Sequence, residues 1–305
     1  MKIELWLERF CEHLSLLNRS EKTIYGYRLE TRLFLEFLVE CGVGDVSEIR
    51  RDDVNSYRVK LHGARKANGE PLNIKTQSAK LGAVFSFLRY LYSEQFILAN
   101  PARDLKLPKV PDSLPAELPD EEQVLKLLET PDTTEPLGLR DRAILELLYS
   151  SALRNSELRA LRMGDIDLHR LEVRIRRGKG QKERVVPLGE PAAVWSEAYL
   201  TRSRPHLARD TTDDVLFLNQ WGRPFTSEVL ANTVSRHAVA ARLPMKVTPH
   251  VLRHACATHM LARKAGLRHL QRLLGHASTT TTERYTRVEV SDLREVFLRC
   301  HPRER

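Results

Sequence analysis

The chain has 305 residues, a length that favours two domains, each able to bury its own core, and that excludes a small disulfide-stapled protein. Hydrophobic residues make up 42% and charged residues 29%, which excludes a disordered chain, and no stretch reaches the ~20 uncharged apolar residues of a membrane span. Lys and Arg outnumber Asp and Glu by 49 to 40, and since both halves share this excess, both domains could grip a polyanion, although a basic enzyme without such a partner stays open.

The N-terminus indicates a protein of the cytosol, and the cysteines indicate neither a zinc site nor disulfides. Glu4 and Glu8 lie inside what would be the apolar core of a signal peptide, so we do not expect export. The cysteines stand far apart without a C-x-x-C pair, which argues against a zinc ribbon and against a disulfide framework. We expect them to be buried as small hydrophobic residues, at Cys11, Cys41, Cys256 and Cys300.

Residues 1–99 carry patterns that predict a small all-helical domain. Apolar residues recur at helical spacing from 4 to about 42, and Ser20 with Thr23 signals a helix start inside this stretch, so the domain opens as a helical hairpin. Two further helices are predicted, the first with acids near its start, over 46–62 and 73–96.

A proline-rich segment at 100–119 predicts the domain linker. Prolines cannot continue a helix and they favour extended backbone, and this segment has them at 101, 108, 111, 115 and 119. The second domain is therefore expected to occupy 120–305.

The second domain combines helical patterns with one predicted β-hairpin. Residues 171–176 alternate apolar and charged side chains, as a strand does, and a Gly-Lys-Gly-Gln turn leads into 185–188, so we expect a hairpin with Lys179 at its tip. Helical spacing is present before the hairpin and over most of the chain after it, at 121–128, 139–150, 155–161 and 192–297. The predicted fold class is mainly α with a small β-hairpin or sheet.

The pentapeptide His-Val-Leu-Arg-His at 250–254 places three ionisable side chains on one side of a helix. The spacing i, i+3, i+4 puts His250, Arg253 and His254 on one face, after a Thr-Pro helix start. A zinc site of the H-E-x-x-H type would need a glutamate where this chain has Val251. On these residues alone, histidines that cap or pack within a helical core are as good an interpretation as a functional site.

Other reactive side chains stand at separated points of the second domain. Arg154 precedes a helix, His276 lies in a Gly-His turn that ends another helix, and Tyr285 follows nine residues later. Arginine forks suit a planar anion, histidine and lysine suit proton transfer, and a tyrosine can be a covalent nucleophile. Together these residue types suit covalent chemistry on a bound anion.

These segments together resemble the tyrosine recombinase (phage integrase) family, and the match is close to its Xer-type site-specific recombinases. The similar segments stand in the family's order, at 152–157, 178–184, 250–254, 274–276 and 285–286. The first domain, with its entry at 21–27, resembles the family's core-binding domain, so the resemblance covers nearly the whole chain. It implies an all-helical SAM-like DNA-binding domain at 1–99, a linker at 100–119 and, at 120–305, an α+β catalytic domain that ends in an exchange helix.

The resemblance implies the nucleophile and its phosphate-binding partners. Tyr285 attacks a DNA phosphodiester, forms a 3′-phosphotyrosine and frees a 5′-hydroxyl, while Arg154 and Arg253 hold the non-bridging oxygens of the scissile phosphate. Glu157 either fixes Arg154 or lies on the helix surface. The phosphotyrosine keeps the bond energy for resealing and the cations take the place of a metal, so we expect no ATP, no metal and no other cofactor.

Proton transfer is expected from one lysine and two histidines. Lys179 resembles the family's general acid, which protonates the leaving 5′-oxygen, with Lys182 as the alternative. We favour Lys179 because it lies between two glycines, where backbone can approach DNA closely. His250 and His276 complete the proton handling and the phosphate contacts, whereas His254 orients the site or packs.

The implied partners are double-stranded DNA, clamped by both domains, and further recombinase subunits; no membrane is expected. The resemblance implies a homo-tetramer, or a hetero-tetramer with a related recombinase, assembled on DNA. The short helix at 291–300 carries an apolar face formed by Leu293, Val296 and Phe297. We expect this face to dock on a neighbouring subunit, with packing on its own domain as the alternative.

Two other functions compete with a recombinase that acts at a short core site in dimer resolution or in mobile-element integration and excision. A type IB topoisomerase would share the arginine, lysine, histidine and tyrosine set, but the helical first domain matches recombinases. A DNA-binding regulator with an inactive site is disfavoured by the complete set, because disuse should erase at least one member.

Overall fold

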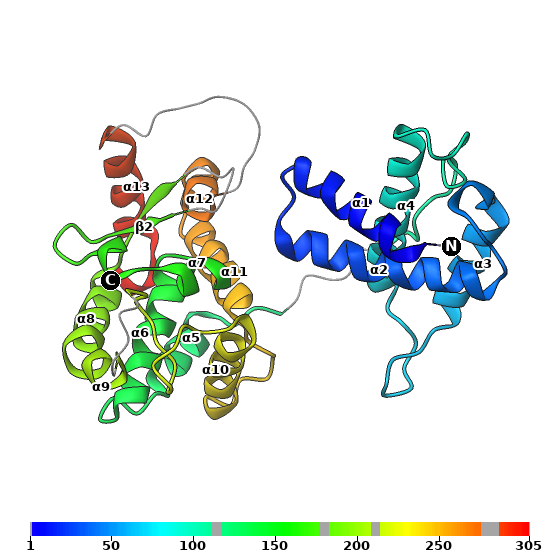
Figure 1. Cartoon of the computed structure of the whole chain (residues 1–305). Coiled ribbons are helices and arrows are strands. Elements are labelled where there is room, and N and C mark those ends of the chain that lie inside the picture. The colour runs from blue at the N-terminus through cyan, green and yellow to red at the C-terminus, as the bar shows by residue number, and fades with distance from the viewer. Residues whose placement is uncertain (1, 112–116, 177–182, 209–213, 276–286, 305) are drawn as a thin grey trace. The chain divides into compact units, whose positions relative to one another are not determined.

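The structure is a computed structural model that describes residues 2–111, 117–176, 183–208, 214–275 and 287–304. The chain divides into two compact units, Met1–Leu114 and Pro115–Arg305 (Figure 1). The described residues are mostly helical with one small antiparallel sheet, which confirms the expected fold class. None of the described helices is long and apolar enough to cross a membrane.

The first unit is a set of helices that opens with the predicted hairpin. Asn18 turns the chain with a positive φ of 56°, and the Ser20 side chain then caps the second helix by accepting a hydrogen bond from the Thr23 amide at 3.2 Å. The helices of this unit are α1 (Ile3–Leu16), α2 (Glu21–Glu40), α3 (Arg51–Gly63) and α4 (Ile74–Ser93). Their shared core is rich in aromatic side chains, among them Phe10, Phe34, Tyr57 and Phe87.

The third helix starts later than the sequence pattern predicts. The Asp45 side chain caps a separate 3₁₀ turn, Val46–Glu48, after which the chain is extended at Arg50. The Asp53 carboxylate then accepts a hydrogen bond from the Arg50 amide at 2.7 Å, which fixes the start of α3. The two acids expected near a helix start therefore lie in its first turn, where the macrodipole favours them.

The cysteines are free thiols, and only two of them are buried as expected. Cys256 and Cys300 lie in the core of the second unit. Cys41 is exposed because it follows the last residue of α2 as its C-cap, and Cys11 is half-buried. The expectation that all the cysteines are buried is wrong for these two.

The second unit is built around α6 (Pro136–Ser150), which is buried along its length from Leu139 onward. The charges inside this helix are paired: Arg140 contacts Asp141 at 2.6 Å and Arg142 contacts Glu146 at 2.9 Å. The surrounding helices are α5 (Glu121–Glu129), α7 (Asn155–Ala160), α8 (Glu190–Ala198), α9 (Arg204–Ala208), α10 (Ser227–Ala240), α11 (Pro249–Ala262), α12 (Leu267–Leu274) and α13 (Arg287–Cys300).

The sheet contains the predicted hairpin strands and one strand that the sequence did not reveal. Strands β2 (Glu172–Ile175) and β3 (Arg184–Pro187) pair antiparallel, with Ile175 opposite Arg184. Strand β1 (Ile166–Asp167) pairs on the other side of β2; its two residues are too few for an alternating pattern. The tip of the hairpin, with Lys179 and Lys182, lies outside the described residues.

The apolar face of α13 packs inside its own unit. Leu293, Val296 and Phe297 are buried in the core, and α13 contacts β3, α11 and α12. This contradicts the expectation that the face docks on a neighbouring subunit. The physical reason is that strand β3 and helices α11 and α12 supply the apolar contacts that the short helix needs, so no partner chain is required to cover it.

Phe297→Ala is expected to destabilise the free protein by about 3 to 5 kcal/mol, because it leaves a cavity in a closed core. Leu298→Ala is the matched control, since Leu298 stands on the same helix and is 40% exposed. Deleting residues 290–305 should lower the melting temperature further and weaken the DNA binding that the resemblance implies. An unchanged melting temperature of the DNA-free monomer in Phe297→Ala would reinstate docking on a neighbour.

His301, which follows α13, should make the second unit sensitive to acid. It is fully buried against Tyr149 and Phe297, and burial lowers its pKa to about 3. The unfolded chain binds a proton near pH 6.5 and the folded chain does not, so stability is full above pH 6.5 and falls as the pH drops toward 3. His301→Leu should abolish a loss of about 1 kcal/mol between pH 6.5 and 5.5, measured by denaturant unfolding, whereas the exposed His254→Leu should not.

Candidate active site

Arg154 is held at the start of α7 by the glutamate three residues further on. The Glu157 carboxylate accepts hydrogen bonds from the Arg154 backbone amide at 2.9 Å and from its guanidinium at 2.7 Å. A second guanidinium nitrogen donates to the carbonyl of Gly275, which follows α12, at 3.2 Å. The side chain is still 38% exposed, so Arg154 can bind an anion from solvent.

Arg253 reaches the same place from the first turns of α11. The Thr248 side chain caps this helix and Pro249 begins it, which confirms the predicted helix start. The Arg253 guanidinium is nearly buried and donates to the carbonyl of Ala152 at 2.5 Å and to the carbonyl of Leu274. Ala152 lies in the left-handed region with φ of 48°, and its carbonyl in this conformation accepts the Arg253 bond.

A third arginine completes the cluster from the sheet. Arg184, the first residue of β3, donates with both terminal nitrogens to the two oxygens of Glu157, at 2.8 and 2.9 Å. Arg253 lies 3.6 Å from the same carboxylate. Three guanidinium groups therefore surround one carboxylate, and the cluster has an excess of positive charge that suits an anionic ligand.

The electrostatics of the cluster keep Glu157 and Arg253 ionised. Burial raises the pKa of Glu157, but hydrogen bonds from Arg184 and from the Arg154 amide outweigh it, and the pKa falls to about 2. Burial, with the charge of Arg154 beside it, lowers the pKa of Arg253 to about 10. At neutral pH the site consequently presents positive charge that does not depend on small changes of pH.

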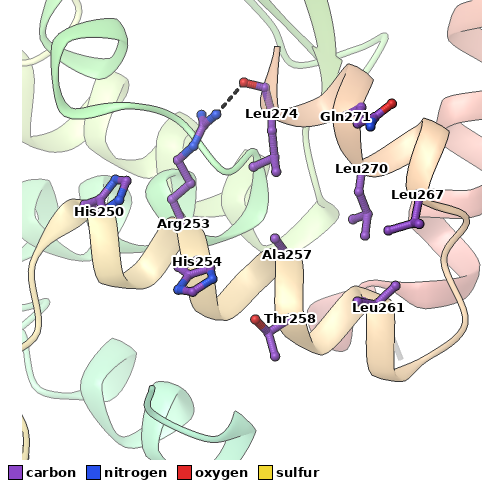
Figure 2. Close-up of a pocket in the computed structure, with 10 residues that line it drawn as sticks. All are labelled: His250, Arg253, His254, Ala257, Thr258, Leu261, Leu267, Leu270, Gln271 and Leu274. Carbon is purple, nitrogen blue, oxygen red and sulfur yellow. Dashed lines mark hydrogen bonds between the residues drawn. The ribbon is translucent and has the colours of Figure 1, made fainter. Parts of the chain in front are cut away.

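His250 and His254 lie on the exposed side of α11, on either side of Arg253 (Figure 2). They stand at the polar end of a groove of about 410 Å³ between α11 and α12, whose other lining is mostly apolar, with Leu261, Leu267 and Leu270. The sequence interpretation that left these histidines as possible core residues is therefore excluded for both. His250 and Arg253 share the mouth of one groove, as their helical spacing predicted.

The structure describes half of the predicted catalytic residues. Arg154, His250 and Arg253 lie in described segments, and the two arginines meet at Glu157. Lys179, His276 and Tyr285 lie outside the described residues.

Arg184 is a member of this site that the sequence pattern did not indicate. The sequence shows a charged residue at the start of a strand, which would usually be exposed, but the Arg184 side chain is 3% exposed in the fold. The strand pattern places residue 184 beside buried apolar residues. Since a buried arginine needs a carboxylate partner, this pattern could have indicated that Arg184 pairs with an acid. The carbonyls of Ala152 and Leu274 carried no such signal, because any residue supplies one.

Comparison with known families gives two matches that together cover most of the chain. The model of the phage integrase family matches residues 118–291. The model of the phage integrase N-terminal SAM-like domain matches residues 7–95. The two matched segments fall in the second and the first compact unit, respectively.

Relatives of high coverage are tyrosine recombinases. The chain is 38% identical over 297 residues to tyrosine recombinase XerC 2 of Ralstonia nicotianae, covering 97% of this chain and 85% of the relative. It is 36% identical over 305 residues to XerC of Oceanobacillus iheyensis, with 99% and 97% covered, and 38% identical over 302 residues to XerD of Yersinia pestis, with 98% and 95% covered.

Solved structures share the fold over nearly the whole chain. The XerH site-specific recombinase bound to its difH substrate, in a post-cleavage complex, matches with a TM-score of 0.67 at 21% identity, covering 97% of this chain and 81% of that chain. The Tn1549 transposon integrase in complex with a circular intermediate DNA matches with a TM-score of 0.70 at 17% identity, covering 97% and 95%.

Proposed function

Because the chain belongs to the phage integrase family, we propose that this site-specific DNA recombinase cuts and rejoins strands through a 3′-phosphotyrosine formed by Tyr285. The tyrosine oxygen attacks the scissile phosphorus, the bond from phosphorus to the 5′-oxygen breaks, and the 5′-hydroxyl leaves. Rejoining reverses these steps with a 5′-hydroxyl from another strand. The observation that carries the proposal is the convergence of Arg154 and Arg253 on Glu157.

The two arginines are suited to bind the scissile phosphate. Guanidinium groups donate paired hydrogen bonds to the non-bridging oxygens and stabilise the charge that grows in the pentacoordinate transition state. Arg154 is exposed enough to meet the phosphate directly. Arg253 is fixed in place by the carbonyls of Ala152 and Leu274, so its position costs little reorganisation during the reaction.

Proton transfer is assigned to Lys179, His250 and His276. Lys179 donates the proton that the leaving 5′-oxygen needs, and the histidines assist proton transfer and contact the phosphate. No step consumes ATP, because the phosphotyrosine stores the energy of the broken bond. We also propose that the reaction needs no metal ion, since the guanidinium groups provide the charge stabilisation that a metal would otherwise supply.

Double-stranded DNA is the substrate, and both domains are proposed to bind it. Residues 1–99 form the core-binding domain, 100–119 the linker and 120–305 the catalytic domain. The positive charge shared by both halves would mainly contact phosphates, which position the protein without reading sequence. Strand exchange requires paired sites, so we propose a homo-tetramer, or a hetero-tetramer with a related recombinase, on DNA.

The test is covalent capture on a library of nicked duplexes with random core sequence, in EDTA and without ATP. A nick just downstream of the cut lets the short fragment that carries the new 5′-hydroxyl diffuse away, so the protein stays attached to a 3′ end. We expect adducts whose sequences converge on one short core site. Adducts without sequence convergence, with relaxation of any supercoiled plasmid, would indicate a type IB topoisomerase, and selective binding without adducts would indicate a regulator.

A further inference from the structure

We propose that Arg184 is a positioning residue for the reaction, holding the Glu157 carboxylate that in turn holds Arg154 and Arg253. The inference rests on the proposed function, which assigns those two arginines to the scissile phosphate. Arg184 is 3% exposed, both its terminal nitrogens donate to Glu157 and its Nε is buried, so its guanidinium is directed at Glu157 and not at solvent. Any effect on catalysis must therefore pass through its partner.

The contacts give Arg184 and Arg154 different roles in the cluster. Arg184 donates to both oxygens of Glu157, at 2.8 and 2.9 Å, in the bidentate geometry that fixes a carboxylate in orientation. Arg154 donates to the same carboxylate with its backbone amide and one guanidinium nitrogen, and keeps 38% of its side chain exposed. Glu157 is thus held from inside the fold by Arg184, while the outer side of Arg154 stays open for a phosphate.

The Nε of Arg184 is buried and makes no hydrogen bond with the described residues. Among the described residues, the Glu157 carboxylate is the group that accepts hydrogen bonds from this buried guanidinium. A buried arginine without its carboxylate would be costly, and so would the carboxylate without its arginine. The pair explains why the first residue of β3 carries a charge where its neighbour across the sheet, Ile175, is apolar and buried.

Loss of Arg184 should change the protonation of Glu157. The carboxylate faces Arg154 at the start of α7, Arg184 on β3 and Arg253 on α11. Arg184 supplies the strongest of the hydrogen bonds that hold the Glu157 pKa near 2 against the effect of burial. Without it the pKa of Glu157 rises, and a protonated Glu157 no longer attracts the Arg154 and Arg253 guanidinium groups as an ion.

The experiment compares Arg184→Met, Arg184→Lys and the control Arg142→Met, which removes an arginine from a different buried carboxylate, Glu146. Single-turnover cleavage of a nicked substrate is measured from pH 8 to 6. We expect Arg184→Met to be slowed about 10- to 100-fold at pH 8, as for a misplaced catalytic group, and to slow further as the pH falls. Arg184→Lys should be slowed but keep the pH profile of the wild type, because it keeps the charge and loses the fork.

A second readout does not depend on activity. The side-chain Nε–H signals of Arg154 and Arg253, observed by NMR in the full chain, should broaden or exchange faster in Arg184→Met and in Arg184→Lys, and stay unchanged in Arg142→Met. If Arg184→Met does not fold, Arg184→Lys decides the question by both readouts. If the wild-type protein forms no adduct, the proposed function is contradicted. The NMR signals would still show whether Arg184 positions Arg154 and Arg253. Unchanged signals together with wild-type rates and pH profiles would overturn the inference.

Discussion

Tyr285→Phe is expected to abolish covalent capture on a nicked substrate and to leave DNA affinity unchanged. The substitution removes only the phenolic oxygen, the atom that we propose forms the bond to phosphorus, and keeps the aromatic ring. Because no other group can take over the attack in place, we expect no detectable adduct even after long incubation. Adducts are measured by denaturing gel with label on either strand end, and affinity by gel shift.

Two other tyrosines serve as controls for this assignment. Tyr199 is fully buried, donates its hydroxyl to the Leu216 carbonyl at 3.0 Å, and has its pKa raised to about 12 by burial, so it is a poor nucleophile. Tyr25 is 71% exposed on α2 of the first unit. Tyr25→Phe and Tyr199→Phe should form adducts as the wild type does. Capture that persists in Tyr285→Phe and disappears in either control would refute the assignment.

The second large effect separates proton donation from charge stabilisation. Lys179→Ala should cut a normal substrate slowly, yet recover most of its rate when the leaving oxygen is replaced by sulfur in a 5′-bridging phosphorothiolate, because a thiolate leaves without a proton. Arg154→Ala and Arg253→Ala should lose about 3 to 4 kcal/mol of transition-state stabilisation, or 10²- to 10³-fold in rate, on both substrates. Single-turnover rates on the paired substrates measure the difference.

Lys182→Ala is the matched control for this experiment. It stands three residues from Lys179 in the same segment, and we expect it to cleave the normal substrate at a rate near that of the wild type. Rescue by sulfur in Lys182→Ala rather than in Lys179→Ala would move the general acid to Lys182. Since Arg253 is buried, thermal unfolding of Arg253→Ala must accompany its rates, to separate lost chemistry from lost folding.

The helices and the arginines on helix starts could be predicted because their signals are local. Ser20 and Thr248 cap helices with their own side chains, and the spacing of His250 and Arg253 follows from the helical repeat. The site beyond these elements depends on tertiary contacts. Glu157 had two interpretations in the sequence, and only the fold, which brings β3 against α7, decides that it anchors Arg154.

The misjudged features share a physical cause. An apolar helix face such as that of α13 indicates that the helix packs against other apolar residues. The sequence pattern does not indicate whether those residues belong to the same chain or to another. The same holds for Arg184, whose burial is set by the neighbouring strand and helix rather than by its own flanking residues. Charges on α6 follow this rule too, because buried Asp141 is paired with Arg140 and His237, and buried Glu146 with Arg142.

The cluster of Arg154, Arg184 and Arg253 around Glu157, here called the arginine pocket, also determines when a newly synthesised chain can acquire activity. Its hydrogen bonds join residues that lie 101 positions apart, between Arg253 and Ala152, and 121 apart, between Arg154 and Gly275. Contacts at such separation form late in folding, after local helices. During synthesis, Arg253 lacks one of the carbonyls that orient it until residue 274 has emerged from the ribosome. Chains that end before residue 274 therefore have no assembled arginine pocket, whatever helices they have already formed.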